Sequence, residues 1–525
     1  ADNTAVGAFS LRCNTTGASN VAVGSASLFA NITGGSNAAV GLNSLTANTT
    51  GSSNNAFGST ALDNNTTGSS NTAIGNDALD ANTTASDNVA VGNGAMFANT
   101  TGCQNTAIGR RALNTNITGD NNVAVGFCAL KLNTADNNTA VGHDALKANT
   151  TGTQNSALGH EALASNTEGN YNVAVGRLAL YENTTGACNV AMGQTALENA
   201  TTASFNTAVG MRAMLNTTTG NKNVAVGTSA MQCNTTGSAN TAVGGMDSNA
   251  FPTMFANTTG SNNTAIGNST LICNTTASNN TALGSSSLKA NTTGATNTAV
   301  GQNSLYSNTT ASDNTSVGAG SLYANTTGSN NAAIGRQALV ANTTGGSNVA
   351  IGRLALKSNI SANLNTAVGD CALQANTTAS DNAAFGAYAL RQNTTGANNL
   401  AVGKNSSLNN TTGANNTALG YNSLFSNTTG HSNVVVGKDA GKAISDGDGN
   451  VIVGALGADN LTTGCYNTYL GSETSPSAVG ILFESVIGRS GTGKGSGTFF
   501  SASSANGVFN TANATAWSQT SDRRI

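Results

Sequence analysis

Charge, proline and aromatic side chains are all scarce in this chain. Only 8% of its 525 residues are charged, two are proline and 4% are aromatic, whereas an ordinary soluble domain is about 25% charged. The net charge of −3 excludes a basic surface for nucleic acid and a polybasic patch for an anionic membrane. No apolar run approaches the 18 or so residues that a membrane span needs. We therefore expect neither nucleic-acid binding nor membrane insertion.

Cysteine spacing gives no sign of a metal site. The eight cysteines are widely separated and form no metal-type motif. Cys233 and Cys273 share one register of the repeat described below, but they lie two coils apart, about 9–10 Å at strand spacing. That separation exceeds the usual reach of a disulfide. The sequence therefore predicts eight free thiols.

Histidine is equally scarce, with three residues in the whole chain. His143 and His160 share a register on successive units, beside Asp144 and Glu161. Stacked imidazole and carboxylate groups can bind a metal ion, but the same register carries Arg and Lys in other units, which favours a solvated face. No metal and no cofactor is predicted.

Glycine is abundant, with 63 residues, and it marks an internal repeat. A glycine closes each of 28 units from Gly7 to Gly471, normally 17 residues apart. The spacing is 16 at 126–142 and 23 at 244–267. Such regularity is typical of a solenoid, in which each unit packs only on its neighbours. The extra residues around 246–254 are expected to bulge outward without breaking the stack.

The consensus unit is Asn-(Thr/Val)-Ala-(Val/Ile)-Gly-x-x-(Ala/Ser)-Leu-x-x-Asn-Thr-Thr-Gly-x-x. Thr-Ala-Val predicts a short strand, Ala-Leu-x-x-Asn a second extended segment, and Asn-Thr-Thr-Gly a turn whose Asn and Gly adopt left-handed angles. The predicted fold is all-β: a parallel β-solenoid, or β-roll, of about 28 coils of 17 residues. At about 4.8 Å per coil it would extend roughly 130–140 Å.

Two regions are expected along the chain. Residues 1–471 form the solenoid shaft, with atypical capping coils from about residue 438, where the Leu column and most Asn-Thr-Thr turns are lost. Residues 472–525 lose the period, and "ILFESVIG" and "GTFFSAS" predict strands of a small C-terminal β region.

An asparagine stands four residues before the closing glycine in all 28 units. Stacked about 4.8 Å apart, such side chains can hydrogen-bond amide to amide and satisfy turn backbone. We predict a structural ladder of asparagines. Its first members are Asn3, Asn20, Asn37, Asn54, Asn71 and Asn88.

An alanine stands two residues before nearly every closing glycine, so one strand face is small and the other bulky. Neither face is charged, which indicates burial on both sides. The bulky face, with the Leu column, is expected to fill the coil, and the Ala face to contact another subunit. The alternative is a wider single-chain coil that encloses both faces. The predicted inter-subunit column includes Ala5, Ala22, Ala39, Ala107 and Ala124.

The units, as in "NTAIGNDAL" and "NVAVGRLAL", resemble the heads of trimeric autotransporter adhesins and, more closely, the repeat shafts of bacteriophage tail fibres. The resemblance covers about residues 3–471. It implies a left-handed parallel β-roll wound as a homotrimer. The coils here are longer than those of adhesin heads, which leaves the cross-section and handedness open.

The final stretch, "NTANATAWSQTSDRRI", resembles the junction before an endosialidase-type intramolecular chaperone of phage fibres. In that family a Ser-Asp pair and a basic stretch open the chaperone, and the chain cuts itself at the serine. The matching positions are Ser521 and Asp522, followed by Arg523 and Arg524. The resemblance implies one self-cleavage at Ser521; no other catalytic constellation is present in the sequence, and no further enzymatic activity is expected.

These observations predict a homotrimeric fibre protein of a virion, outside the cell, which attaches to a host-surface receptor or glycan. The alternative is a cellular extracellular adhesin or filament protein. Asn-x-Thr sequons in most units, for example at Asn48, Asn82, Asn291 and Asn342, would then carry glycans. An ice-binding face is disfavoured, because adjacent threonines of the turn point to opposite sides.

Overall fold

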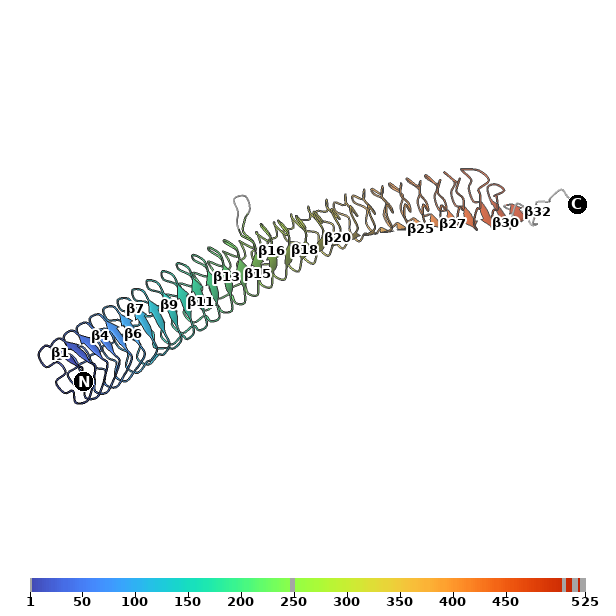
Figure 1. Cartoon of the computed structure of the whole chain (residues 1–525). Helices are drawn as coiled ribbons and strands as arrows, with labels where there is room; N and C mark the ends of the chain where they lie inside the picture. The colour runs from blue at the N-terminus through green and yellow to red at the C-terminus, as the bar shows by residue number, and fades with distance from the viewer. Residues whose placement is uncertain (1, 246–250, 503–506, 512–517, 520–525) are drawn as a thin grey trace. The chain divides into compact units, whose positions relative to one another are not determined.

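The computed structural model describes residues 2–245, 251–502, 507–511 and 518–519 (Figure 1). It divides into two units, residues 1–262 (unit 1) and 263–525 (unit 2), which are treated separately below. Throughout the described residues the regular structure is β-strand, and none of them lies in a helix. Correspondingly, the described part of the chain holds no helix long and apolar enough to span a membrane.

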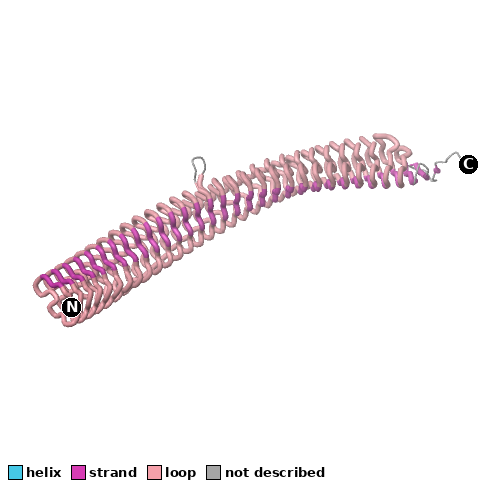
Figure 2. Tube along the Cα trace, viewed as in Figure 1, coloured by secondary structure: helices cyan, strands magenta, loops and turns pink. Residues whose placement is uncertain are grey.

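Unit 1 is a stack of parallel strands, each three residues long and paired with the next along the chain. The register is constant: Ala5 lies opposite Ala22, and Ala107 opposite Ala124. The strands follow one another on one side of the coil, and loops complete each turn (Figure 2). The strands are β1 (Thr4–Val6), β2 (Val21–Val23), β3 (Ala38–Val40), β4 (Asn55–Phe57), β5 (Thr72–Ile74), β6 (Val89–Val91), β7 (Thr106–Ile108), β8 (Val123–Val125), β9 (Thr139–Val141), β10 (Ser156–Leu158), β11 (Val173–Val175), β12 (Val190–Met192), β13 (Thr207–Val209), β14 (Val224–Val226) and β15 (Thr241–Val243).

Unit 2 continues the same pattern and ends differently. Its last strands, β30 to β32, include two antiparallel pairings, β30 with β31 and β31 with β32. The strands are β16 (Thr264–Ile266), β17 (Thr281–Leu283), β18 (Thr298–Val300), β19 (Thr315–Val317), β20 (Ala332–Ile334), β21 (Val349–Ile351), β22 (Thr366–Val368), β23 (Ala383–Phe385), β24 (Leu400–Val402), β25 (Thr417–Leu419), β26 (Val434–Val436), β27 (Val451–Val453), β28 (Thr468–Leu470), β29 (Ser485–Ile487), β30 (Thr498–Ala502), β31 (Gly507–Thr511) and β32 (Ser518–Gln519).

The predicted fold class is confirmed: the chain is a parallel β-solenoid with a repeat of 17 residues. The parallel ladder runs past residue 471: β29 pairs in register with β28, Gly488 follows Gly471 by another 17 residues, and β30 pairs parallel with β29. The sequence pattern hides this turn, since Glu484 replaces the usual asparagine. Glu484 N–H nevertheless donates to Asn467 Oδ1 over 2.8 Å, as an asparagine there would.

The inward face of the strands is the opposite of the one predicted. Ala22, Ala39, Ala107 and Ala124 are completely buried inside a single chain, and only Ala5, on the first strand, is exposed. The four buried alanines therefore cannot form a contact between subunits. They pack in the interior with the Leu column, whose members such as Leu113 are also fully buried.

A steric reason explains why alanine occupies the inner position. Besides its strand alanine, each coil must enclose a second small residue, one leucine and two asparagine amides. A valine on every inner position would overfill that space, because extra methylene groups in a packed interior force strained rotamers. The bulky Val and Ile side chains point outward instead.

The segment after each closing glycine is a sequence of turns, so the predicted second extended segment is wrong. Leu residues of the interior column adopt left-handed angles, as in Leu113 with φ of 51°. Left-handed backbone costs an L-residue about 1–2 kcal/mol, and burial of the leucine with inter-coil backbone hydrogen bonds offsets this. The Asn-Thr-Thr-Gly turn does not use left-handed angles, and its last position accepts alanine as well as glycine, as at Ala85.

Both irregular coils keep the stack in register. In the 16-residue coil the turn lacks one residue, and Asn138 N–H still donates to Asn122 Oδ1 over 2.9 Å. Around the insertion, Asn257 Nδ2 donates to Asn234 Oδ1 over 2.8 Å across 23 residues. Of the bulge predicted around residues 246–254, residues 246–250 lie outside the described residues.

The last coils of unit 2 have a different interior. Val435, Ile452 and Tyr469 replace the inner alanine, and a glycine and an alanine, Gly441 and Ala458, replace the leucine. A Cβ on Gly441 would lie 3.1 Å from the Ile452 side chain, so the exchange of large for small residues conserves the enclosed volume. These side chains form one buried apolar cluster, which also includes Ile444, Val486 and Phe500.

Candidate functional surfaces

The asparagines predicted as a ladder are buried and bonded from coil to coil. Asn20 N–H donates to Asn3 Oδ1 over 2.8 Å, and Asn20 Nδ2 donates to Gly34 O over 2.9 Å. The same pair of bonds recurs at Asn37, Asn54, Asn71 and Asn88. The bonds run mainly from side chain to backbone, so these residues act in holding the turns and present no surface to a ligand.

A second asparagine row, which the sequence analysis treats only as turn residues, makes the amide-to-amide contacts. Asn31 Nδ2 donates to Asn14 Oδ1 over 2.8 Å and to Gly34 O over 2.9 Å. Gly34 O therefore accepts one hydrogen bond from each row. The two rows form one connected network in each coil, and both rows are shielded from solvent.

The outward strand face is an uncharged surface. Its first and third positions carry Thr, Val, Ile, Leu, Ala, Ser, Asn, Phe or Met, and neither position is ever charged. The third position is well exposed, at 42% for Ile74, 41% for Ile108 and 51% for Leu158 in unit 1. In unit 2, Ile334 and Phe385 are 42% and 41% exposed. An apolar stripe therefore follows the strands through each unit.

A column of stacked rings lies on the surface of unit 1. The His143 ring lies 5.0 Å from Phe127 and 5.2 Å from His160, nearly parallel to both. His143 Nδ1 lies 3.6 Å from Asp144 Oδ2, and His160 Nδ1 lies 3.5 Å from Glu161 Oε2. Each histidine has its own carboxylate, and the described residues contain no group of three or more metal-ligating side chains.

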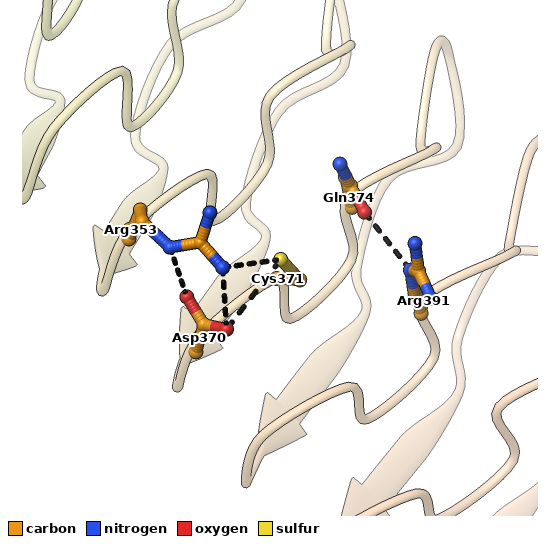
Figure 3. A network of polar contacts seen from close by, with 5 residues as sticks. All are labelled: Arg353, Asp370, Cys371, Gln374 and Arg391. Carbon is orange, nitrogen blue, oxygen red and sulfur yellow. Dashed lines mark hydrogen bonds and ion pairs between the residues drawn. The ribbon is translucent and has the colours of Figure 1, made fainter.

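A polar network links successive coils of unit 2 (Figure 3). Arg353 Nε and Nη2 donate to the two carboxylate oxygens of Asp370 over 2.9 and 3.0 Å. This hydrogen bond and the Asp370 charge raise the pKa of Arg353. Farther along, Arg391 Nε donates to Gln374 Oε1 over 2.9 Å. Such exposed pairs hold the coil register and contribute little to stability individually.

All eight cysteines are free, as predicted. Cys371 lies beside the Arg353–Asp370 pair, with its Sγ 3.7 Å from Asp370 Oδ2. Burial, and then the Asp370 charge, raises the pKa of Cys371, and burial also raises the pKa of Cys128 and Cys233. A raised pKa keeps a thiol protonated and unreactive, so these three cysteines are packing residues.

Glu484 is a fully buried carboxylate in unit 2 that the sequence analysis missed. It accepts hydrogen bonds from Tyr469 Oη over 2.8 Å, from Ser477 N over 3.1 Å and from Gly495 N over 2.9 Å. Burial, and then the neighbouring carboxylate, raises the pKa of Tyr469. The arrangement joins β28 to the following loops and is structural. The predicted cleavage residues, Ser521 and Asp522, lie outside the described residues.

Comparison with known proteins gives no relative: no family model, no curated protein and no solved structure matches the chain. The function must therefore be argued from these surfaces.

Proposed function

We propose that this chain is a structural fibre protein of a virion, in which several copies associate side by side and attach to a host surface. The observation that carries the proposal is the uncharged outward strand face. Each of the fifteen strands of unit 1 carries an apolar side chain at its outward third position, so the apolar stripe runs from β1 to β15. A typical monomer confines its exposed apolar side chains to smaller patches.

A second copy of the chain is the partner that fits this face. The face repeats with every coil, so a partner must offer apolar groups at the same spacing over the same length, and an identical chain does so. A stable interface buries about 800 Å² per partner, and a face that recurs on every strand lets two chains remain in contact over many coils. We expect three copies, as in the fibre shafts that the units resemble, with the outward Val and Ile columns at the interface in place of the alanines.

The buried sequons favour a virion fibre over a glycosylated cellular adhesin. Asn48 and Asn342 are completely buried, and each Nδ2 donates two hydrogen bonds inside the coil. A glycan attached at Nδ2 would remove a donor and place a bulky polar group in the interior. The fold therefore suits a chain whose asparagines stay unmodified. Self-cleavage at Ser521 remains part of the proposal.

The test is the mass of the native chain by sedimentation equilibrium, in wild type and in the triple variant Ile74→Lys, Ile108→Lys and Leu158→Lys. We expect three chains in the wild type and a folded monomer in the variant, because buried unpaired ammonium groups oppose association. The matched control places lysines on the exposed turn, at Thr67, Thr101 and Thr151, and should keep the wild-type mass.

A monomeric wild type would refute side-by-side association, and an unchanged mass in the strand-face variant would place the interface elsewhere. The fibre role is tested separately by immunogold electron microscopy, with antibodies against the purified chain. We expect labelled projections on virus particles encoded by the genome that carries this gene. Particles without label would refute the virion assignment.

A further inference from the structure

The described coils of each unit contain a surface hollow at a glycine of the same register. The unit 2 hollow has a volume of about 460 Å³ and the unit 1 hollow about 430 Å³. Each lies at a glycine two residues after a closing glycine, Gly320 and Gly94. Every other unit carries a side chain at that register. Another hollow, of about 330 Å³, adjoins the insertion and is lined by Phe251 and Pro252 next to residues outside the description.

The missing side chain creates the space. Gly320 adopts φ of 66°, the same left-handed conformation that asparagine adopts in this register at Asn303. A Cβ on Gly320 would meet only the Gln337 side chain, at 3.6 Å. A side chain therefore fits at position 320, and the backbone conformation does not demand glycine there. Glycine leaves open a space that a side chain at this register would otherwise fill.

Tyr323 forms one wall of the unit 2 hollow. Its ring lies 4.9 Å from Tyr306 and within 10° of parallel. Tyr306 is itself held by Lys289, whose Nζ lies 5.2 Å from the ring centroid and donates to the phenol oxygen over 3.3 Å. Tyr323 is 38% exposed. A fixed aromatic side chain thus presents an apolar surface to the hollow.

The remaining side chains that line the hollow are mostly polar, and their polar atoms are available to a ligand. Gln302, Asn303 and Gln337 contribute three side-chain amides, and Arg336 contributes a guanidinium. Within the described part of the chain, these four side chains make no hydrogen bond or ion pair. No carboxylate lines the hollow, which is completed by Ala319 and Val340. Three amides and a guanidinium offer both donors and acceptors around an aromatic wall.

We propose that the unit 2 hollow binds a saccharide. Amide side chains can donate to one hydroxyl and accept from another, while an aromatic wall suits the C–H surface of a sugar ring. A single guanidinium among three neutral amides suits a neutral or weakly acidic sugar better than a phosphate. A purely apolar ligand would leave four polar groups unpaired, which is costly.

The unit 1 hollow provides an internal comparison. It also has an aromatic wall, Phe97, and an arginine, Arg111. Its amides are already used, because Asn114 Nδ2 donates to Gly94 O over 2.8 Å and Asn93 Nδ2 donates to Asn76 O over 3.4 Å. We therefore assign saccharide binding to the unit 2 hollow, which has free amides.

This inference deepens the proposed attachment function, and its test needs only the isolated chain. Saturation-transfer NMR is recorded with a panel of glucose, galactose, N-acetylglucosamine and glucuronic acid oligosaccharides. We expect at least one to bind. Gly320→Asn should weaken that binding roughly tenfold or more, since it fills the hollow with a residue that this register already accepts. Ser286→Asn, at the same register but outside the hollow, is the matched control and should bind normally.

If no member of the panel binds the wild-type chain, or if Gly320→Asn binds as well as wild type, the inference is wrong. Loss of binding in Ser286→Asn as well would place the sugar site elsewhere and also overturn it. Circular dichroism confirms that each variant keeps the solenoid. Failure here leaves the labelling of virus particles unaffected, so the two proposals can fail independently.

Discussion

At the scale of single residues, the asparagine amide holds one coil to the next. Within an intact stretch of the second row an amide such as Asn48 donates twice, to the preceding amide and to a carbonyl of its own turn, and accepts from the following amide. An interruption should therefore leave an unpaired oxygen. Buried unpaired amide oxygens occur at Asn183, where Ala200 follows in the register, at Asn427, where Ile444 follows, and at Asn116, where the 16-residue coil follows.

Ala200→Asn should restore the row and stabilise unit 1. The new Nδ2 can donate to Asn183 Oδ1, and the new side chain would be held as its neighbours are. A buried unsatisfied polar atom costs about 1–3 kcal/mol, so we expect a gain of about 1 kcal/mol after the added ordering of the side chain. Guanidinium denaturation followed by circular dichroism measures it.

The reverse change provides the control for this prediction. Asn342→Ala removes a member from an intact part of the row. It leaves Asn325 Oδ1 without a partner and leaves Asn359 Nδ2 with only its bond to Ala362 O. It should destabilise unit 2 by about 2 kcal/mol or more. If Ala200→Asn is neutral while Asn342→Ala is costly, the interruption is already compensated and the account of the orphaned oxygen is wrong.

At the scale of the coil, sequence predicts the elements better than their orientation. The period, the three-residue strand and the inward Leu column all follow from the repeat. Which face of the strand points inward does not follow from the repeat, because neither face of Thr-Ala-Val is charged and a three-residue strand offers only one alternation. The variation among the units carries the missing signal: up to Ala418 the inner position accepts only Ala, or Ser at 316, whereas the outer third position ranges from Val141 to Phe57 and Met192. Enclosed positions restrict volume; exposed ones do not.

The surface sites were harder to predict, because they depend on single departures from the repeat. Glu484 occurs at a register that elsewhere carries asparagine, and Gly320 at one that carries glycine in only one other unit, at Gly94. Their role becomes visible only when the coils are stacked and the space around them is known. The second asparagine row was missed for a different reason: Asn-Thr-Thr-Gly is sufficiently explained as a turn, so nothing in one unit indicates a bond between units.

Stacking also places like charges close together, and Asp80 shows the consequence. Burial, and then the charges of Asp63 and Asp77, raises the pKa of Asp80 from 3.8 to about 6. The folded chain therefore binds this proton more tightly than the unfolded chain. The stability that this group contributes is complete below about pH 3.8 and is lost as the pH rises through about 6.

We expect Asp80→Asn to stabilise unit 1 at pH 7 and to have little effect at pH 4. The gain should not exceed about 1 kcal/mol, because the half-exposed side chain is screened by solvent. Denaturation at both pH values measures it, with Asp87→Asn as the control, since Ser70 and Gln104 flank Asp87 in its register. A gain that is equal at both pH values would contradict the assigned cause.

At the scale of the whole molecule, the repeated sequon makes folding depend on the compartment in which the chain is synthesised. Asn-x-Thr recurs in most units, and its asparagine is buried in each of Asn48, Asn82, Asn291 and Asn342. Glycans are attached to the chain before it folds, and every attachment would break the second row at that coil. Because each coil packs only on its neighbours, a few such breaks should stop the stack from extending.

The chain should therefore fold when made in the bacterial cytosol and fail when directed through a eukaryotic secretory pathway. We expect a β-rich circular dichroism spectrum in the first case and a glycosylated, protease-sensitive product in the second. The informative control changes the second threonine of each turn, such as Thr50 or Thr344, to valine. These threonines are exposed, so the change abolishes the sequon and leaves the asparagine in place. The chain without sequons should fold in both compartments. The contrary result would be a secreted chain that carries glycans on the asparagines of the second row and still gives the β-solenoid spectrum. Such a chain would show that the second row is dispensable, and that assembly of the coil does not depend on the buried amides.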